Sequence, residues 1–212
     1  MTLPESTAQR RKKIKRPLIV IGGKPKSKKS VLAQQLAQDL GLHLIETEGA
    51  KPYYSIKNLT TVSTIENMKT AVLSKKEPIV LDSISELYRN EMRKHTGKDW
   101  GVTNIITNSV LDIVDHMHKF GGIIVSHGKM VNNDYTLHGN IAWQYKVDAI
   151  FVMANSKDNP LQVGILSKGR HVPEVMRMIT VQSVDITRND EVVNLPKLSG
   201  DGYNYIKKFM SG

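Results

Sequence analysis

The chain contains one segment in which a buried strand, a basic loop and a helix are expected in immediate succession. The apolar run at 18–21 (LIVI) predicts a strand buried on both faces, as in a parallel sheet. Residues 22–30 form a loop of glycine, lysine, proline and serine. Leucine then recurs at every fourth position between Val31 and Leu40, ahead of Gly41, which predicts a helix with a glycine cap. This order is typical of α/β proteins.

The loop has the composition and position of a phosphate-binding loop. Against the pattern G-x-x-x-x-G-K-[ST], the chain matches with Gly23, Lys29 and Ser30. Backbone N–H groups of such a loop, together with the following helix N-terminus, hold a triphosphate. Lys29 is expected to reach the β- and γ-phosphates of ATP, and the Ser30 hydroxyl to bind Mg²⁺. The other candidate nucleotide contacts are Lys24, Ser27, Lys28 and Val31.

Lys28 stands where this pattern has its second glycine. That glycine lets the backbone approach phosphate closely, often with unusual dihedral angles, so Lys28 has to make the same turn with a Cβ atom. The replacement predicts that ATP is bound but hydrolysed slowly. The alternative is an ordinary basic loop between a strand and a helix.

The alternation of strands and helices continues downstream. Further strands are predicted at 42–47, 79–81, 122–125, 149–153, 162–166 and 178–184, and helices at 65–74, 85–95 and 103–120. Such βαβ units predict a mainly parallel sheet with helices on both faces. The length of 212 residues suits one domain, which we expect over residues 17–212.

Residues 1–16 are predicted to form a disordered basic arm. The arm has little apolar content and ends in a block of cations: Arg10, Arg11, Lys12, Lys13, Lys15 and Arg16. It is either a solvated tail or a tether for nucleic acid. The net charge of +10 favours polyanionic partners such as nucleic acid, through phosphate neutralisation.

Cysteine is absent, which excludes disulfides and thiolate metal sites. No apolar run approaches the ~20 residues of a membrane span, and the start of the sequence has no secretory signal. We therefore expect a soluble, intracellular protein with no membrane partner.

Polar residues follow three of the predicted strands. Asp82 comes directly after the apolar run at 79–81, at the sheet edge where α/β proteins bind ligands, and is predicted to hold Mg²⁺ together with Ser30. Its alternative role is to cap the next helix, for which Ser83 or Ser85 would serve equally.

Glu46 and Glu48 lie at the end of the second strand, where a carboxylate could activate the water that attacks the γ-phosphate. Either could instead be a solvated loop residue. His127 follows the fourth strand and could sense the γ-phosphate, or it could be a purely structural residue.

These motifs occur in the order Gly23–Ser30, Glu46–Gly49, Leu81–Ser83 and Val125–His127. The order resembles that of RecA/Rad51-like ATPases, specifically the short phage-encoded ones related to Sak-type single-strand annealing recombinases. The resemblance covers most of the chain and implies a RecA-like P-loop NTPase core. It also implies that Glu48 is the residue that polarises the attacking water.

The resemblance further implies assembly on DNA. Members of the family place basic residues on a late strand hairpin that reaches the nucleotide of the neighbouring subunit in a filament or ring. Lys168 and Arg170 lie at that position, with an exposed basic turn as the alternative. The family binds DNA through loops after the fourth and fifth strands, here 128–140 and 155–160. The first loop carries Lys129, Asn132, Asn133, Tyr135 and His138.

The first functional interpretation is an ATP-dependent recombinase-type ATPase that acts on single-stranded DNA, without sequence preference, by annealing or recombination. Its expected partners are further copies of itself and a single-strand-binding protein, in the cytoplasm, or in the host cytoplasm if a phage encodes the chain. The alternative is a non-enzymatic, nucleotide-gated binding or regulatory module in which Lys28 prevents turnover. A small-molecule kinase is a third class, but the turn at 168–170 is too sparse for the Arg-rich lid of such kinases.

Overall fold

The computed structural model describes residues 16–49, 52–94, 100–131, 134–137, 145–156, 159, 161–169, 172–188 and 191–212. Apart from Arg16, the basic arm predicted for residues 1–16 lies outside the described residues. The predicted functional residues Asn132, Asn133, His138 and Arg170 also lie outside them, as do the side chains of Lys129 and Tyr135.

Strands and helices alternate through the first two thirds of the chain, and strands dominate the last third before a final helix. The elements are β1 (Leu18–Gly23), α1 (Lys29–Leu40), β2 (His43–Glu46), β3 (Leu59–Thr61), α2 (Ile65–Leu73), β4 (Ile79–Asp82), α3 (Ile84–Lys94), α4 (Trp100–Phe120), β5 (Gly122–Val131), β6 (Asp134–Leu137), β7 (Ala149–Asn155), β8 (Gln162–Lys168), β9 (Met176–Arg188), β10 (Glu191–Ser199) and α5 (Asp201–Ser211).

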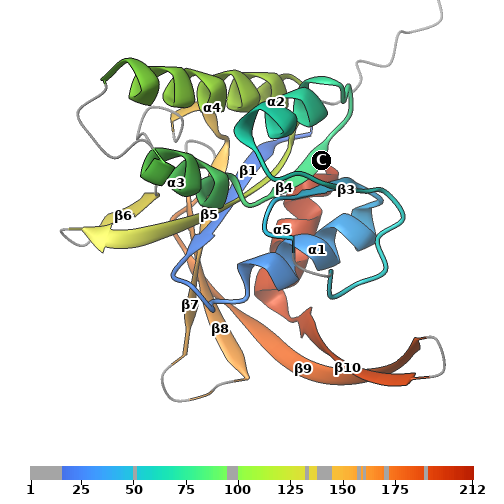
Figure 1. Ribbon diagram of the computed structural model, residues 1–212. Coiled ribbons are helices and arrows are strands. Elements are labelled where there is room, and N and C mark those ends of the chain that lie inside the picture. The colour runs from blue at the N-terminus through green and yellow to red at the C-terminus, as the bar shows by residue number, and fades with distance from the viewer. Residues whose placement is uncertain are drawn as a thin grey trace, which may run out of the picture.

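The strands form one ten-stranded sheet in the order β10-β9-β8-β7-β1-β5-β4-β2-β3, with β6 paired to β5 beside this row (Figure 1). The strands from β7 to β3 in this row pair in parallel. β8, β9 and β10 extend the sheet in antiparallel fashion, and the β9–β10 hairpin reaches well away from the parallel core (Figure 1). The predicted α/β class with a mainly parallel sheet is confirmed.

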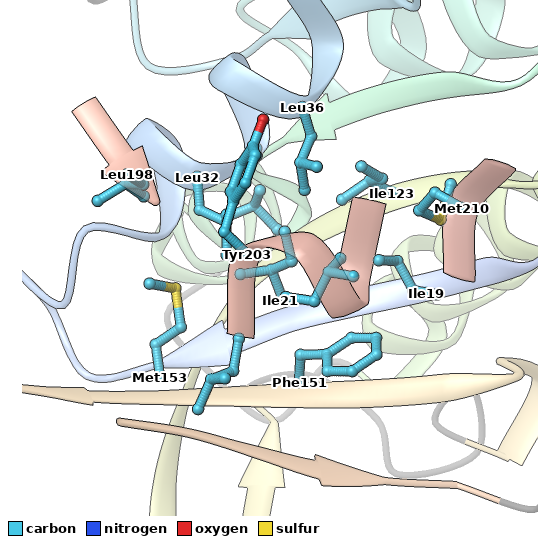
Figure 2. Packing of buried hydrophobic residues seen from close by; sticks show 14 of the residues in the cluster. Ile19, Ile21, Leu32, Leu36, Ile123, Phe151, Met153, Leu198, Tyr203 and Met210 are labelled. Atoms are coloured by element: carbon cyan, nitrogen blue, oxygen red, sulfur yellow. The ribbon is translucent and has the colours of Figure 1, made fainter. Parts of the chain in front are cut away.

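Helices cover both faces of the parallel strands. Along β1, Ile19 and Ile21 pack into a core with α1 and α5, which Figure 2 shows around Phe151. The alternate residues Leu18 and Val20 pack into a second core with α2, α3 and α4. Because successive side chains of a strand point to opposite faces, the continuous apolar run of β1 is explained by this double burial.

Two parts of the fold differ from the sequence-based expectation. Within the predicted DNA-binding loop at 128–140, residues 128–131 are the end of β5 and residues 134–137 form the short strand β6. The two strands pair from Gly128↔Leu137 to Val131↔Asp134. The β-branched and aromatic residues in this stretch suit paired strands. DNA binding by this stretch stays a prediction. β3, β10 and α5 were not predicted. β10 contains Pro196, which lacks an N–H group and is tolerated on a sheet edge.

The register of the parallel strands brings the polar residues together at the carboxyl edge of the sheet. Gly23 at the end of β1 is level with His127 in β5, and Glu46 at the end of β2 is level with Asp82 at the end of β4. Ligands bind at this edge in open α/β sheets. Among the described helices, none has the length and apolar character to cross a membrane.

Candidate functional site

The loop between β1 and α1 requires glycine at its first position. Gly23 has a φ of 155°, and a Cβ atom added to it would lie 2.5 Å from Ser27 Oγ and 2.7 Å from the backbone oxygen of Met153. Ser27 is itself buried. The loop is therefore folded tightly against the end of the sheet, and the predicted importance of Gly23 has a steric basis.

Lys28 adopts the left-handed conformation that its place in the motif requires. Its φ and ψ are 65° and 23°, and it occupies the N-cap position of α1. Lys26 has a similar φ of 64°. A side chain in this region costs on the order of 1 kcal/mol relative to glycine. The loop therefore makes the turn of a phosphate-binding loop with two lysines in positions that favour glycine.

Lys29 is folded back onto the loop and held close to two acids. Its Nζ donates a hydrogen bond to the backbone oxygen of Lys24 at 2.8 Å, and only 5% of the residue is exposed. Burial lowers the pKa of Lys29 to about 8, although the charges of Asp82 and Glu48 oppose the shift. A buried cation is thus placed beside the loop, with its hydrogen bond to Lys24 available for exchange with a phosphate oxygen.

Asp82 faces the start of α1. The Ser30 hydroxyl donates to Asp82 Oδ1 at 3.1 Å, and Gln34 also hydrogen-bonds the Asp82 side chain. Burial, and then the charge of Glu48, raise the pKa of Asp82 to about 7. A hydroxyl and a carboxylate oxygen are ligands of the kind that Mg²⁺ favours, so Ser30 and Asp82 fit this ion.

The two glutamates after β2 have different environments. Glu46 is buried, and its carboxylate accepts hydrogen bonds from the backbone N–H groups of Glu48 at 2.6 Å and Gly49 at 2.9 Å. Glu48 is exposed and accepts a hydrogen bond from the Ser83 hydroxyl at 3.2 Å. Glu46 shapes the loop, and Glu48 is the carboxylate that faces the pocket described next.

A pocket of about 600 Å³ at the carboxyl edge of the sheet collects six of the twelve predicted site residues. It is lined by Pro25, Lys26, Lys28, Lys29, Ser30, Val31, Glu48, Tyr53, Val125, His127 and Pro196. Gly23, Ser27 and Asp82 are buried and do not line the pocket. Lys168 does not line it either. Its Nζ lies 3.9 Å from Glu174, so any contact with a nucleotide would have to be made in another subunit.

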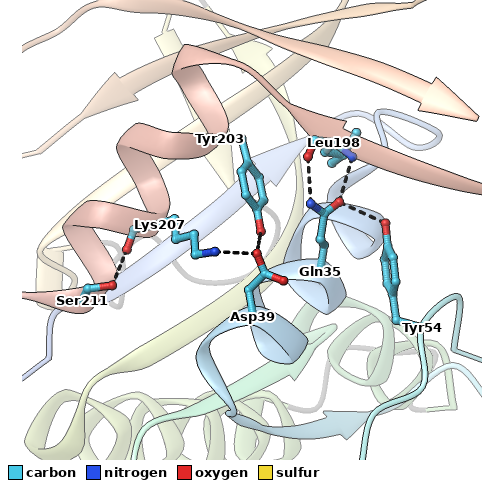
Figure 3. A network of polar contacts seen from close by, with 7 residues as sticks. All are labelled: Gln35, Asp39, Tyr54, Leu198, Tyr203, Lys207 and Ser211. Atoms are coloured by element: carbon cyan, nitrogen blue, oxygen red, sulfur yellow. Dashed lines mark hydrogen bonds and ion pairs between the residues drawn. The ribbon is translucent and has the colours of Figure 1, made fainter. Parts of the chain in front are cut away.

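Two lining residues, Tyr53 and Pro196, were not expected from the sequence. Tyr53 is 44% exposed, and its backbone N–H donates to Gln34 Oε1 at 2.8 Å. Pro196 belongs to β10, and its backbone oxygen accepts a hydrogen bond from the Tyr54 hydroxyl. Gln35 of α1 bonds to Leu198 of the same strand (Figure 3). These contacts hold β10 against the pocket. No local pattern in the sequence predicts them.

Comparison with known proteins bears on the fold. No family model matches the sequence, and no curated protein matches it. Among solved structures, the crystal structure of the RadB recombinase is similar, with a TM-score of 0.55 and 16% sequence identity, over 79% of this chain and 89% of that chain. The chain has a RecA-like fold. At this level of identity the RecA-like relationship concerns the fold alone, and it does not single out the phage-encoded Sak-type proteins.

Proposed function

We propose that the chain is an ATP-dependent, single-stranded-DNA-binding ATPase of the recombinase type. The observation that carries this proposal is the convergence of Lys29, the Ser30–Asp82 pair and Glu48 around one pocket at the carboxyl edge of a RecA-like sheet. Phosphoryl transfer needs a cation for the phosphates, oxygen ligands for Mg²⁺ and a group that orients water. The proposal assigns the first task to Lys29, the second to the Ser30–Asp82 pair and the third to Glu48.

Each residue in the proposed mechanism acts on a stated group. Lys29 exchanges its hydrogen bond with the Lys24 carbonyl for the β- and γ-phosphate oxygens of ATP. Ser30 and Asp82 would hold Mg²⁺, which supplies positive charge to the transferring phosphoryl group. Glu48, held by Ser83, accepts the proton of the attacking water. The proposal places the nucleobase against Tyr53 and Pro196, which both line the pocket.

The DNA-binding part of the proposal rests on charge and on the shape of the fold. The net charge of +10 favours a polyanion, and the strand pair β5–β6 continues directly from the pocket residue His127. DNA held by this strand pair would therefore be coupled to the nucleotide through one continuous strand. We also propose that the chain forms a homo-oligomer in which Lys168 approaches the nucleotide of a neighbouring subunit. We further propose that the chain is related to the Sak-type annealing recombinases.

A second candidate function is a nucleotide-gated binding module without turnover. It is favoured by the left-handed conformation of Lys28, because a side chain at this position changes the part of the loop that approaches the phosphates most closely. In that case ATP binding alone would order the protein, and Glu48 would have no catalytic task.

Fluorescence anisotropy of labelled single-stranded DNA, titrated with the full chain in the presence of ATP and Mg²⁺, tests the proposal. We expect binding without sequence preference, and a log–log slope of affinity against salt of about −0.7 per phosphate contact. Deleting residues 1–16 should flatten the slope if the arm is a tether and leave it unchanged if the arm is solvated. No binding at low salt would refute the recombinase interpretation in favour of the nucleotide-gated module.

A further inference from the structure

A group of three potential metal ligands includes two residues that line the pocket, Glu48 and His127. Glu48 after β2, Glu86 in α3 and His127 in β5 each offer one ligand atom, and these atoms lie within 4.8 Å of one another. Glu48 and His127 line the pocket, whereas Glu86 was not singled out in the sequence and has no role in the proposed hydrolysis. The three residues come from three separate segments, so their convergence is a product of the fold.

Polar contacts hold the Glu48 and Glu86 side chains and the backbone of His127. The Ser83 hydroxyl donates to Glu48 Oε1 at 3.2 Å, and the backbone N–H of His127 donates to Ser85 Oγ at 3.0 Å. Ser85 immediately precedes Glu86 in α3, so the second bond ties the strand that carries His127 to the helix that carries Glu86. Arg89 forms an ion pair with Glu86 Oε2. Such outer contacts are a usual feature of metal sites.

We propose that Glu48, Glu86 and His127 bind a transition-metal dication such as Zn²⁺ or Co²⁺, at a position additional to the Ser30–Asp82 pair. An imidazole nitrogen with two carboxylate oxygens suits these metals, whereas Mg²⁺ prefers oxygen ligands only. Around a tetrahedral Zn²⁺, ligand atoms are about 3.4 Å apart, so separations of up to 4.8 Å must close by at most about 1.4 Å. Glu48 is exposed and can make this movement without disturbing the core.

Three protein ligands leave one coordination position open, as in sites that bind water or a substrate oxygen. Here two of the three ligands, Glu48 and His127, line the pocket that also contains Lys29 and Ser30. This part of the inference rests on the proposed function: a metal bound to Glu48 removes the carboxylate that accepts the proton of the attacking water. Zn²⁺ should therefore inhibit ATP hydrolysis while leaving ATP binding intact.

Co²⁺ titration of the tag-free full chain, without nucleotide, tests the site independently of any ATPase activity. Bound Co²⁺ is followed by its visible absorption, and Zn²⁺ is then added to displace it. Glu86→Gln removes one ligand. Glu91→Gln is a matched control, because Glu91 lies on the same helix, pairs with Lys94 as Glu86 pairs with Arg89, and has a side-chain exposure of 20% against 23% for Glu86. Glu86→His restores a ligand but not the ion pair with Arg89.

We expect one Co²⁺ to bind per chain, with a visible absorption band that Zn²⁺ abolishes. The affinity for Co²⁺ should be at least tenfold weaker in Glu86→Gln and unchanged in Glu91→Gln. Glu86→His should bind Co²⁺ again. The proposal is overturned if Glu86→Gln binds Co²⁺ as the unsubstituted chain does, if Glu91→Gln weakens binding equally, or if Glu86→His fails to restore it. Absence of ATPase activity with Co²⁺ binding intact would refute the proposed hydrolysis and leave the metal site standing.

Discussion

The side-chain amide of Gln35 in α1 satisfies both backbone polar groups of Leu198 in β10. Its Nε2 donates to the Leu198 oxygen at 2.7 Å, and its Oε1 accepts from the Leu198 N–H at 2.7 Å (Figure 3). Gln35 therefore takes the place that a further strand would have at this point of the sheet edge. Through it, the helix that begins at the lysine-rich loop is joined to the strand that brings Pro196 to the pocket.

Replacing Gln35 should destabilise the protein strongly. In Gln35→Ala the buried N–H and C=O of Leu198 lose their partners, which should cost about 2–4 kcal/mol of unfolding free energy. Gln38→Ala, on the exposed side of the same helix, should change it by less than about 0.5 kcal/mol. Chemical denaturation measures both. Similar losses in the two variants would show that the Gln35–Leu198 pair has no special role.

Replacing Asp82 should raise the stability of the metal-free protein and weaken the binding of Mg²⁺. Burial and Glu48 raise the pKa of Asp82 to about 7. A raised pKa means that the ionised carboxylate destabilises the fold, with a penalty that grows as the pH rises from about 4 to 7. Without Mg²⁺ at pH 8, Asp82→Asn should therefore melt at a higher temperature than the unsubstituted chain, and this advantage should shrink towards pH 4.

The same variant should gain less thermal stability from ATP with Mg²⁺, because the amide is a poorer ligand than the carboxylate. Thermal denaturation with and without ATP and Mg²⁺ measures both effects. A lower melting temperature of Asp82→Asn at pH 8 without Mg²⁺ would mean that the hydrogen bonds to Ser30 and Gln34 outweigh the burial of the charge.

The sequence was sufficient to predict features that depend on neighbouring residues. The strand–loop–helix around Lys29 follows from local periodicity, and Asp82 and Glu48 stand at strand ends, where parallel topology alone brings them to one edge. The left-handed turn of Lys28 was foreseen because the motif demands it.

Features that depend on distant segments could not be predicted. Pro196 reaches the pocket because β10 returns to α1, through contacts such as the Gln35–Leu198 pair that join residues 163 positions apart. Glu86 meets His127 through a helix–strand contact with no local pattern. The loop expected after His127 contains a strand pair that was not predicted, in which residues 128–131 pair with residues 134–137.

The affinity for ATP should fall as the pH rises through about 8. Burial lowers the pKa of Lys29 to about 8, and bound phosphates favour its charged form, so binding at higher pH must take up a proton. We expect the dissociation constant of ATP to increase about tenfold between pH 7 and pH 9. Isothermal titration calorimetry measures it. Lys29→Arg stays charged over this range and should show no such trend; an equal trend in that variant would place the titrating group elsewhere.

Glycine at position 28 should relax the loop. Lys28→Gly removes a Cβ atom from a residue with a φ of 65°, and should raise the unfolding free energy by about 0.5–1 kcal/mol. Lys24→Gly is the comparison, because Lys24 is an exposed residue of the same loop that lacks a positive φ, and this change should be neutral or destabilising. Equal effects of the two substitutions in chemical denaturation would argue against strain at Lys28.

The steady-state rate of ATP hydrolysis, measured with and without single-stranded DNA for the unsubstituted chain and for Glu48→Gln, tests the central claim most directly. We expect Mg²⁺-dependent hydrolysis that single-stranded DNA accelerates. Glu48→Gln should abolish it while binding ATP with unchanged affinity, because only the proton acceptor for the attacking water is lost. A rate that is the same in both proteins and indifferent to DNA would contradict the claim that this pocket is the active site of a DNA-dependent ATPase.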